Sequence, residues 1–151
     1  MRTVVQRVSE AEVRVGGDRV GRIGRGYALL VGVERGDTEA DADETARKVA
    51  ALRLFPGRTP MDRTVVEEGG GCLVVPQFTL AGSVRKGNRP SFDGAEAPER
   101  AEVLWRRVAD RLRASGVKVA LGRFGAAMEV DLVCDGPVTF VVAVREGAVV
   151  E

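Results

Sequence analysis

Residues 128–144 read MEVDLVCDGPVTFVVAV, and this stretch decides which fold the chain adopts. Two runs rich in β-branched residues, 128–133 and 138–144, lie on either side of an Asp-Gly-Pro tripeptide. Proline donates no backbone hydrogen bond and is normally kept out of the interior of a sheet. The pattern therefore predicts two strands with an interruption at Gly136-Pro137.

Outward from this stretch, alternating and β-branched residues predict further strands. They cover 2–8, 11–16, 27–33, 72–80 and 118–122, with a glycine-punctuated hairpin and a short outer strand over 16–26. The run at 72–80 contains Pro76, which predicts a sheet edge or a β-bulge at that point.

Two segments change to a helical period. Residues 39–53 follow Asp37 and Thr38, either of which is a good N-cap, and carry acidic residues in the first turn. Residues 98–115 begin with proline, carry an apolar stripe and stop before Gly116. Many strands at hairpin spacing with two main helices predict an α+β fold. We expect mainly antiparallel β-sheets curled toward a barrel, in a single domain over 1–151.

Composition excludes several classes of function. The chain has 151 residues, 44% hydrophobic and 30% charged, which is typical of a globular protein. No apolar run approaches a membrane span and no signal-peptide core follows Met1, so we expect a cytoplasmic protein with no membrane partner. Histidine is absent, which excludes Ser-His-Asp and Cys-His arrangements. We expect no metal and no cofactor, and expect Cys72 and Cys134 to be buried reduced thiols.

The formal net charge of +1 gives no indication of a nucleic-acid partner, but one loop concentrates basic residues. Arg85, Lys86 and Arg89 lie next to Ser91 in GSVRKGNRPSF, residues 82–92. Such a loop is suited to phosphate groups, and the alternative is a solvated polar loop. The residues alone leave both interpretations open.

Three segments place Gly, Pro or polar groups among apolar β residues: 76–80, 122–128 and 135–139. Violations of local rules are expected at strained or functional places, and the structural alternative is a β-bulge at the rim of a barrel. Together with the start of the chain, these segments resemble one known family. MRTVVQRVSEAEV, PQFTL, RKGNRPSF, GRFGA and DGPVTF occur in the order and spacing of the D-aminoacyl-tRNA deacylases, over nearly the whole length.

The resemblance implies a homodimeric enzyme that hydrolyses the ester between a D-amino acid and the terminal adenosine of tRNA. In this family a glutamine-centred segment of one subunit faces a Gly-Pro dipeptide, held cis, from the other. Here these are residues 76–80 and Gly136-Pro137. The dipeptide then excludes L-residues, because their side chains point at its carbonyls. We expect the backbone N–H groups of Gln77 and Phe78 to bind the oxyanion, with assistance from the vicinal ribose hydroxyl of the substrate.

The remaining roles follow from the same resemblance. Thr79 is expected to line the pocket and form hydrogen bonds, because no base is identifiable near it for a nucleophilic role. Arg7 corresponds to a family arginine near the Gly-Pro element. The other expected contacts are Pro76, Leu80, Phe124, Gly125 and Met128 for the substrate and its terminal adenosine, and Lys86, Arg89 and Ser91 for the acceptor stem or the structure of their loop.

The chain departs from the family pattern at two positions, with Pro76 where serine is usual and Cys134 where asparagine is usual. Proline lacks an N–H and fixes φ, so any hydrogen bond from the serine is lost or replaced. A Pro-Gln start is similar to a related animal branch that removes L-alanine and holds its Gly-Pro trans. A deacylase of L-Ala-tRNA is therefore one alternative function. A non-catalytic tRNA-binding homodimer is another, because the basic loop and the aromatic-bearing segment 122–128 would serve such a module equally well.

Overall fold

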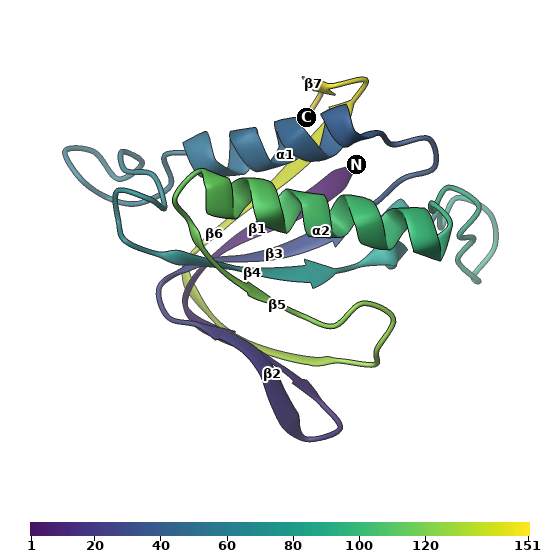
Figure 1. The fold of residues 1–151 in the computed structure, drawn as a ribbon, viewed down its shortest axis with the longest axis horizontal. Coiled ribbons are helices and arrows are strands. Elements are labelled where there is room, and N and C mark those ends of the chain that lie inside the picture. Colours follow the sequence, from purple (N-terminus) through teal and green to yellow (C-terminus); the bar gives the residue numbers. More distant parts are fainter.

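A computed structural model describes residues 1–151 and shows a curved, seven-stranded sheet with two helices on one face (Figure 1). The strands are β1 (Arg2–Val15), β2 (Asp18–Ile23), β3 (Gly26–Gly32), β4 (Gly71–Pro76), β5 (Lys118–Leu121), β6 (Glu129–Arg145) and β7 (Ala148–Val149). The helices are α1 (Glu39–Ala51), α2 (Pro98–Ala114) and the short 3₁₀ helix η1 (Phe78–Ala81). None of the helices combines the length and apolarity needed to cross a membrane.

The strand order β5-β4-β3-β1-β6-β7, with β2 paired to the second half of β1, makes a mixed sheet. The pairs β1–β2, β1–β3, β1–β6 and β6–β7 are antiparallel, whereas β3–β4 and β4–β5 are parallel. The predicted α+β class and mainly antiparallel pairing are confirmed. The sheet curls but does not close, because β5 and β7 end the strand order.

Two predicted pairs of strands are instead single long strands. The expected strands 2–8 and 11–16 form β1, whose register to β6 shifts between Gln6 and Glu10. Bulges of this kind bend a strand without ending it. Likewise β6 runs through Gly136-Pro137: Gln6 pairs with Thr139 and Val8 with Cys134, so residues 135–138 lie opposite Arg7 alone. We call residues 135–138 the Gly-Pro excursion.

The expected strand 72–80 is too long, because β4 ends at Pro76 and η1 begins at Phe78. Pro76 pairs with Val31 at the last position of an internal strand, so it marks neither a sheet edge nor a bulge. Without an N–H, Pro76 donates nothing to the ladder. The Gln77 N–H makes the last bond, 2.8 Å to the Val31 carbonyl, before the chain turns into η1.

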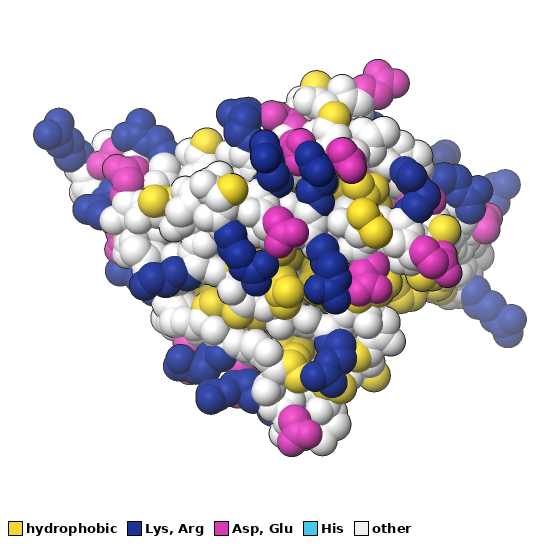
Figure 2. Space-filling view, in the orientation of Figure 1, with side chains coloured by type: hydrophobic (Ala, Val, Ile, Leu, Met, Phe, Trp, Pro, Cys, Tyr) yellow, Lys and Arg dark blue, Asp and Glu magenta, His cyan; other side chains and the backbone are white.

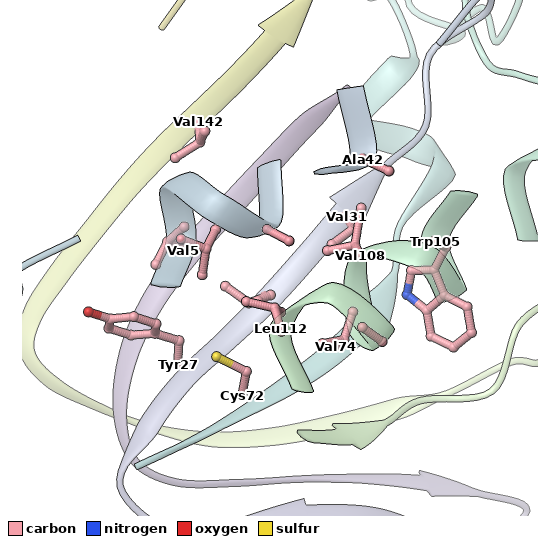
Figure 3. Packing of buried hydrophobic residues seen from close by; sticks show 14 of the residues in the cluster. Val5, Tyr27, Val31, Ala42, Cys72, Val74, Trp105, Val108, Leu112 and Val142 are labelled. Atoms are coloured by element: carbon pink, nitrogen blue, oxygen red, sulfur yellow. The ribbon is translucent and has the colours of Figure 1, made fainter. Parts of the chain in front are cut away.

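The core has two parts on opposite faces of the sheet. The larger part lies between the sheet and the two helices and contains Trp105, Tyr27 and Leu112 (Figure 3). These three side chains and that of Leu29 are fully buried. Burial of each such side chain stabilises the fold by roughly 1.5–3 kcal/mol. The smaller part consists of Val8, Ala11, Val13, Ile23, Ala28, Leu73 and Val75. All residues of the smaller part lie on β1, β2, β3 and β4, so on this face the curved sheet packs against itself.

Candidate active site

The carboxyl ends of the parallel strands β3, β4 and β5 lie at one edge of the sheet, which we call the carboxyl edge. The predicted segments 76–80 and 122–128 meet at this edge. Gly122 follows β5, and its N–H donates to the Val74 carbonyl of β4 at 2.9 Å. A Cβ on Gly122 would lie 3.0 Å from the Met128 sulfur and 3.3 Å from Pro76 Cδ. The structure therefore brings Pro76 and Met128 together around this glycine.

Phe124 lies in the same loop, with its ring tilted against Trp105 of α2 at a centroid distance of 5.9 Å. Phe124 and Met128 are half-buried, each packed against one part of the core. Gly125 between them has φ +77°, a left-handed conformation that suits glycine. The loop thus presents an aromatic face and a thioether beside the end of β4.

Two unpaired backbone donors lie at the start of η1. The N–H groups of Phe78 and Thr79 have no hydrogen-bond partner, whereas that of Leu80 donates to the Gln77 carbonyl at 3.2 Å. The expectation that Gln77 supplies an oxyanion donor is wrong, because its N–H is committed to Val31. The available pair of neighbouring amides is Phe78 and Thr79.

The Thr79 side chain lies beside these amides and accepts a hydrogen bond from the Gln77 side-chain amide. No carboxylate or amine is bonded to its hydroxyl. Phe78 is 57% exposed, and its ring contacts Phe92 at a centroid distance of 5.2 Å. Phe92 was not predicted individually, and the only signal in the sequence is an aromatic residue at the end of a polar loop.

The loop between η1 and α2 is closed by a backbone pair. Ser83 and Ser91 exchange N–H···O bonds of 2.7 and 2.8 Å, and the Ser91 hydroxyl accepts the Asp93 N–H at 3.4 Å. Ser91 therefore structures the loop. Lys86 and Arg89, between the two serines, are exposed and make no ion pair.

The Gly-Pro excursion forms a second group of predicted residues, and its Gly136–Pro137 bond is cis. Arg7 is 8% exposed and lies directly against it. The Arg7 Nε donates to the Asp135 carbonyl at 3.0 Å, one terminal nitrogen donates to the Leu54 carbonyl at 2.6 Å, and Nε lies 3.6 Å from the Asp135 carboxylate. Arg7 thus fixes the start of the excursion and lies beside the Gly-Pro element.

Gln6 fixes the end of the excursion and was not predicted. Its side-chain amide donates to the Val138 carbonyl at 3.2 Å and accepts the Thr139 hydroxyl at 2.6 Å. Successive residues of a strand point to opposite faces. Gln6 and Arg7 therefore hold the excursion from both faces of β1.

One chain does not bring the two groups together. Arg7 pairs with Tyr27 and Tyr27 with Cys72, so the excursion lies five residues before Gln77 along the sheet. At about 3.3 Å per residue this is about 16 Å, and the three strand spacings between β6 and β4 add about 14 Å across the sheet. Gly136 and Pro137 are exposed.

The outer edge of β6 is unpaired until β7 begins to pair at Val144. Four of its large apolar residues are exposed between 38% and 50%: Leu132, Val133, Phe140 and Val141. A long apolar edge strand is a template for association with another chain.

The cysteines differ in environment. Cys72 is completely buried in the larger part of the core, and burial raises the pKa of its thiol far above the ordinary value. Cys134 on β6 is exposed, so the expectation of two buried thiols is wrong for this residue.

A profile of the D-Tyr-tRNA(Tyr) deacylase family matches residues 4–143, and the chain belongs to this family. The D-aminoacyl-tRNA deacylase of Symbiobacterium thermophilum is 56% identical over 94% of this chain and 95% of the relative. That of Paracoccus denitrificans is 54% identical over 92% and 94%. The prediction of an enzyme of this hydrolase class is confirmed.

Two solved structures have the same fold as this chain. A "c-Myc DNA Unwinding Element Binding Protein" superposes with a TM-score of 0.89 at 36% identity, covering 96% of this chain and 99% of the other. A probable eukaryotic D-amino acid tRNA deacylase, 19% identical, has the same fold with a TM-score of 0.80 over 93% and 97% of the two chains.

Proposed function

We propose that this chain, as a homodimer, hydrolyses the ester that joins a D-amino acid to the terminal adenosine of tRNA. The observation that carries the proposal is the pair of unpaired backbone N–H groups of Phe78 and Thr79 at the start of η1. They lie beside a hydroxyl that has no base, in a chain without histidine. Such a site favours a reaction that needs positioning and charge stabilisation more than a strong nucleophile.

The chemistry follows from these donors. Water attacks the ester carbonyl, and the negative charge that develops on the carbonyl oxygen is stabilised by the two amides. Loss of one such donor typically costs about 10²–10³-fold in rate. The ester C–O bond then breaks, and a proton of the attacking water passes to the ribose oxygen, assisted by the neighbouring ribose hydroxyl. Free D-amino acid and tRNA are released.

Thr79 supports this reaction without acting as the nucleophile. Its hydroxyl accepts a hydrogen bond from Gln77 and has no group beside it that would take its proton. The hydroxyl therefore orders the Gln77 side chain and remains free to donate to the substrate. Phe124 and Met128 offer an aromatic face and a polarizable thioether to the adenine ring.

The dimer is supported by the separation of the two groups of residues. The Gly-Pro excursion is exposed and lies about 16 Å along the sheet from the level of Gln77, so it does not reach η1 of its own chain. The neighbouring edge of β6 carries exposed apolar side chains that association would bury. A two-fold contact through β6 presents each excursion to the partner.

Selection of D-residues then results from exclusion. The excursion is held at one end by Arg7 and at the other by Gln6, so its carbonyls are rigid. We propose that the side chain of an L-residue, bound at η1 of the partner, points at these carbonyls, whereas that of a D-residue points to open space. This arrangement rejects L-residues without recognising any particular side chain.

Hydrolysis of D-Tyr-tRNA, L-Tyr-tRNA and L-Ala-tRNA by the purified protein tests the proposal. We expect turnover of the D-substrate only, and we expect Thr79→Ala to retain appreciable activity because the donors are backbone groups. Preference for L-Ala-tRNA would transfer the chain to the alternative branch. Binding of tRNA without turnover would identify a non-catalytic module, and complete inactivity of a folded Thr79→Ala variant would restore a nucleophilic hydroxyl.

A further inference from the structure

Basic side chains occupy two different environments in this protein. Over α1 and α2 the arginines are neutralised: Arg107 lies 2.7 Å from Asp43, and Arg106 lies 2.9 Å from Glu102. Basic and acidic groups are interspersed on this face (Figure 2). The exposed cations at the carboxyl edge make no ion pair and no side-chain hydrogen bond: Arg35, Arg85, Lys86, Arg89 and Arg123.

These cations follow all three parallel strands. Arg35 comes after β3, the cations of loop 82–97 after β4 and η1, and Arg123 after β5. Backbone contacts join the segments: the Arg35 N–H donates to the Gly94 carbonyl at 2.8 Å, and Glu34 forms an antiparallel bridge with Ala95. Because parallel strands end at a common edge, the free cations lie at the same edge of the sheet as η1.

Few carboxylates compete with them. Within loop 82–97, Glu96 is bound by Arg100 and accepts the Gly36 and Ala97 N–H groups, which leaves Asp93 as the one carboxylate without a cation partner. The local charge at the carboxyl edge is therefore positive, although the net charge of the whole chain is only +1. Positive charge around a site raises the local concentration of an anionic substrate.

We propose that Arg35 and Arg123 lie on the path of the nucleic acid and bind its phosphodiester backbone as it leads away from η1, together with Arg85, Lys86 and Arg89. The proposal rests on the proposed function, because it takes η1 as the position of the ester. Unpaired, exposed guanidinium groups suit phosphate, whose binding releases counterions and carries no sequence information. Arg35 and Arg123 flank η1 from the neighbouring strands, so together they define the direction in which the strand leaves.

Salt-dependent binding of deacylated tRNA tests this assignment. We would measure Kd between 50 and 300 mM KCl for the wild type, Arg35→Ala and Arg123→Ala. Each lost phosphate contact should lower the slope of log Kd against log[KCl] by about 0.7–0.9 and weaken binding about 6-fold at 0.1 M salt. Arg58→Ala and Lys118→Ala are matched controls, because these residues are also exposed and unpaired but lie before β4 and at the start of β5, at the opposite edge.

The outcomes separate the two proposals. Unchanged slopes in Arg35→Ala and Arg123→Ala, or equal losses in the two controls, would overturn the phosphate path even where the wild type hydrolyses D-Tyr-tRNA. Loss of slope in the two test variants alone supports the path, whether or not turnover is found. Absence of hydrolysis by a wild type that shows these slopes would refute the deacylase proposal and not the phosphate path.

Discussion

Replacement of Gly32 by alanine tests whether the position of η1 controls activity. Gly32 is the last residue of β3 and lies against η1. A Cβ at this position would lie 2.7 Å from Leu80 Cβ and 2.9 Å from the Gln77 carbonyl oxygen. Carbon atoms pack at about 3.5–4.0 Å, so one side of the contact must move by about 1 Å.

We expect η1 to move and β3 to stay. The strand is bonded on both sides, to β1 and to β4, whereas η1 is a single short turn at the surface. Overpacking of this size costs about 1–3 kcal/mol in stability. A displacement of about 1 Å in a positioned catalytic group costs about 10²-fold in rate, because the Phe78 and Thr79 amides move with η1.

The assay is single-turnover hydrolysis of D-Tyr-tRNA together with thermal unfolding. Gly24→Ala serves as the control, because a Cβ there would have no atom within 4 Å and its φ is not in the left-handed region. We expect Gly32→Ala to lose about 10²-fold in rate and to remain folded at the assay temperature, and Gly24→Ala to behave as wild type. A folded Gly32→Ala protein with a rate within about twofold of wild type would refute the assignment of the donors to η1.

Three further changes test the packing. Thr3→Val should raise the melting temperature, because it removes a fully buried hydroxyl without a hydrogen-bond partner, whose burial costs about 1–3 kcal/mol. Thr45→Val should lower the melting temperature, because the Thr45 hydroxyl donates to the Asp41 carbonyl at 2.7 Å. Burial alone would raise the pKa of Asp41, but hydrogen bonds from the Gly147 N–H and from the Thr38 N–H and hydroxyl hold this pKa below the usual value. The ionised carboxylate therefore stabilises the fold above pH about 4. Asp41→Asn should therefore be less stable at pH 7 in urea titrations, and the difference from wild type should shrink as the pH falls below about 4. Cys72 should react with a thiol reagent only after unfolding.

The helices were predictable because their signals are local. Pro98 occupies the first turn of α2, and Gly116 follows its end with φ +91°. The end of β4 was not predictable from the same kind of signal. Phe78 and Leu80 continue the apolar alternation of the strand, so the sequence predicts that the strand goes on. In the structure the bond from Gln77 to Val31 of β3 is the last of the ladder, and the Leu80 N–H turns back to the Gln77 carbonyl.

The site was predictable as a set of segments but not as an arrangement. Residues 76–80 and 122–128 meet because they follow adjacent parallel strands, a pairing that no spacing in the sequence reveals. Gln6 was missed because its partner Val138 lies 132 residues away in the chain. The choice of oxyanion donors failed for a similar reason, since a backbone N–H carries no mark in the sequence that tells whether it is already bonded.

The proposed division of the site between η1 of one chain and the Gly-Pro excursion of its partner predicts complementation between two defective chains. Gly32→Ala damages η1, whereas Gly136→Ala damages the excursion, because Gly136 has φ +127° and its Cβ would lie 2.9 Å from the Val138 nitrogen and 3.2 Å from an Arg7 nitrogen. A mixed dimer contains one site built from the intact half of each chain. Because the excursion is proposed only to exclude L-residues, Gly136→Ala alone should hydrolyse both D- and L-Tyr-tRNA, whereas Gly32→Ala alone should be slow on both. Random mixing of equal amounts places half of the Gly136→Ala chains in mixed dimers, where the intact excursion of the partner faces their η1, so unfolding and refolding the two variants together should halve the rate of L-Tyr-tRNA hydrolysis per Gly136→Ala chain. An unchanged rate in a folded, dimeric mixture would mean that each chain completes its own site.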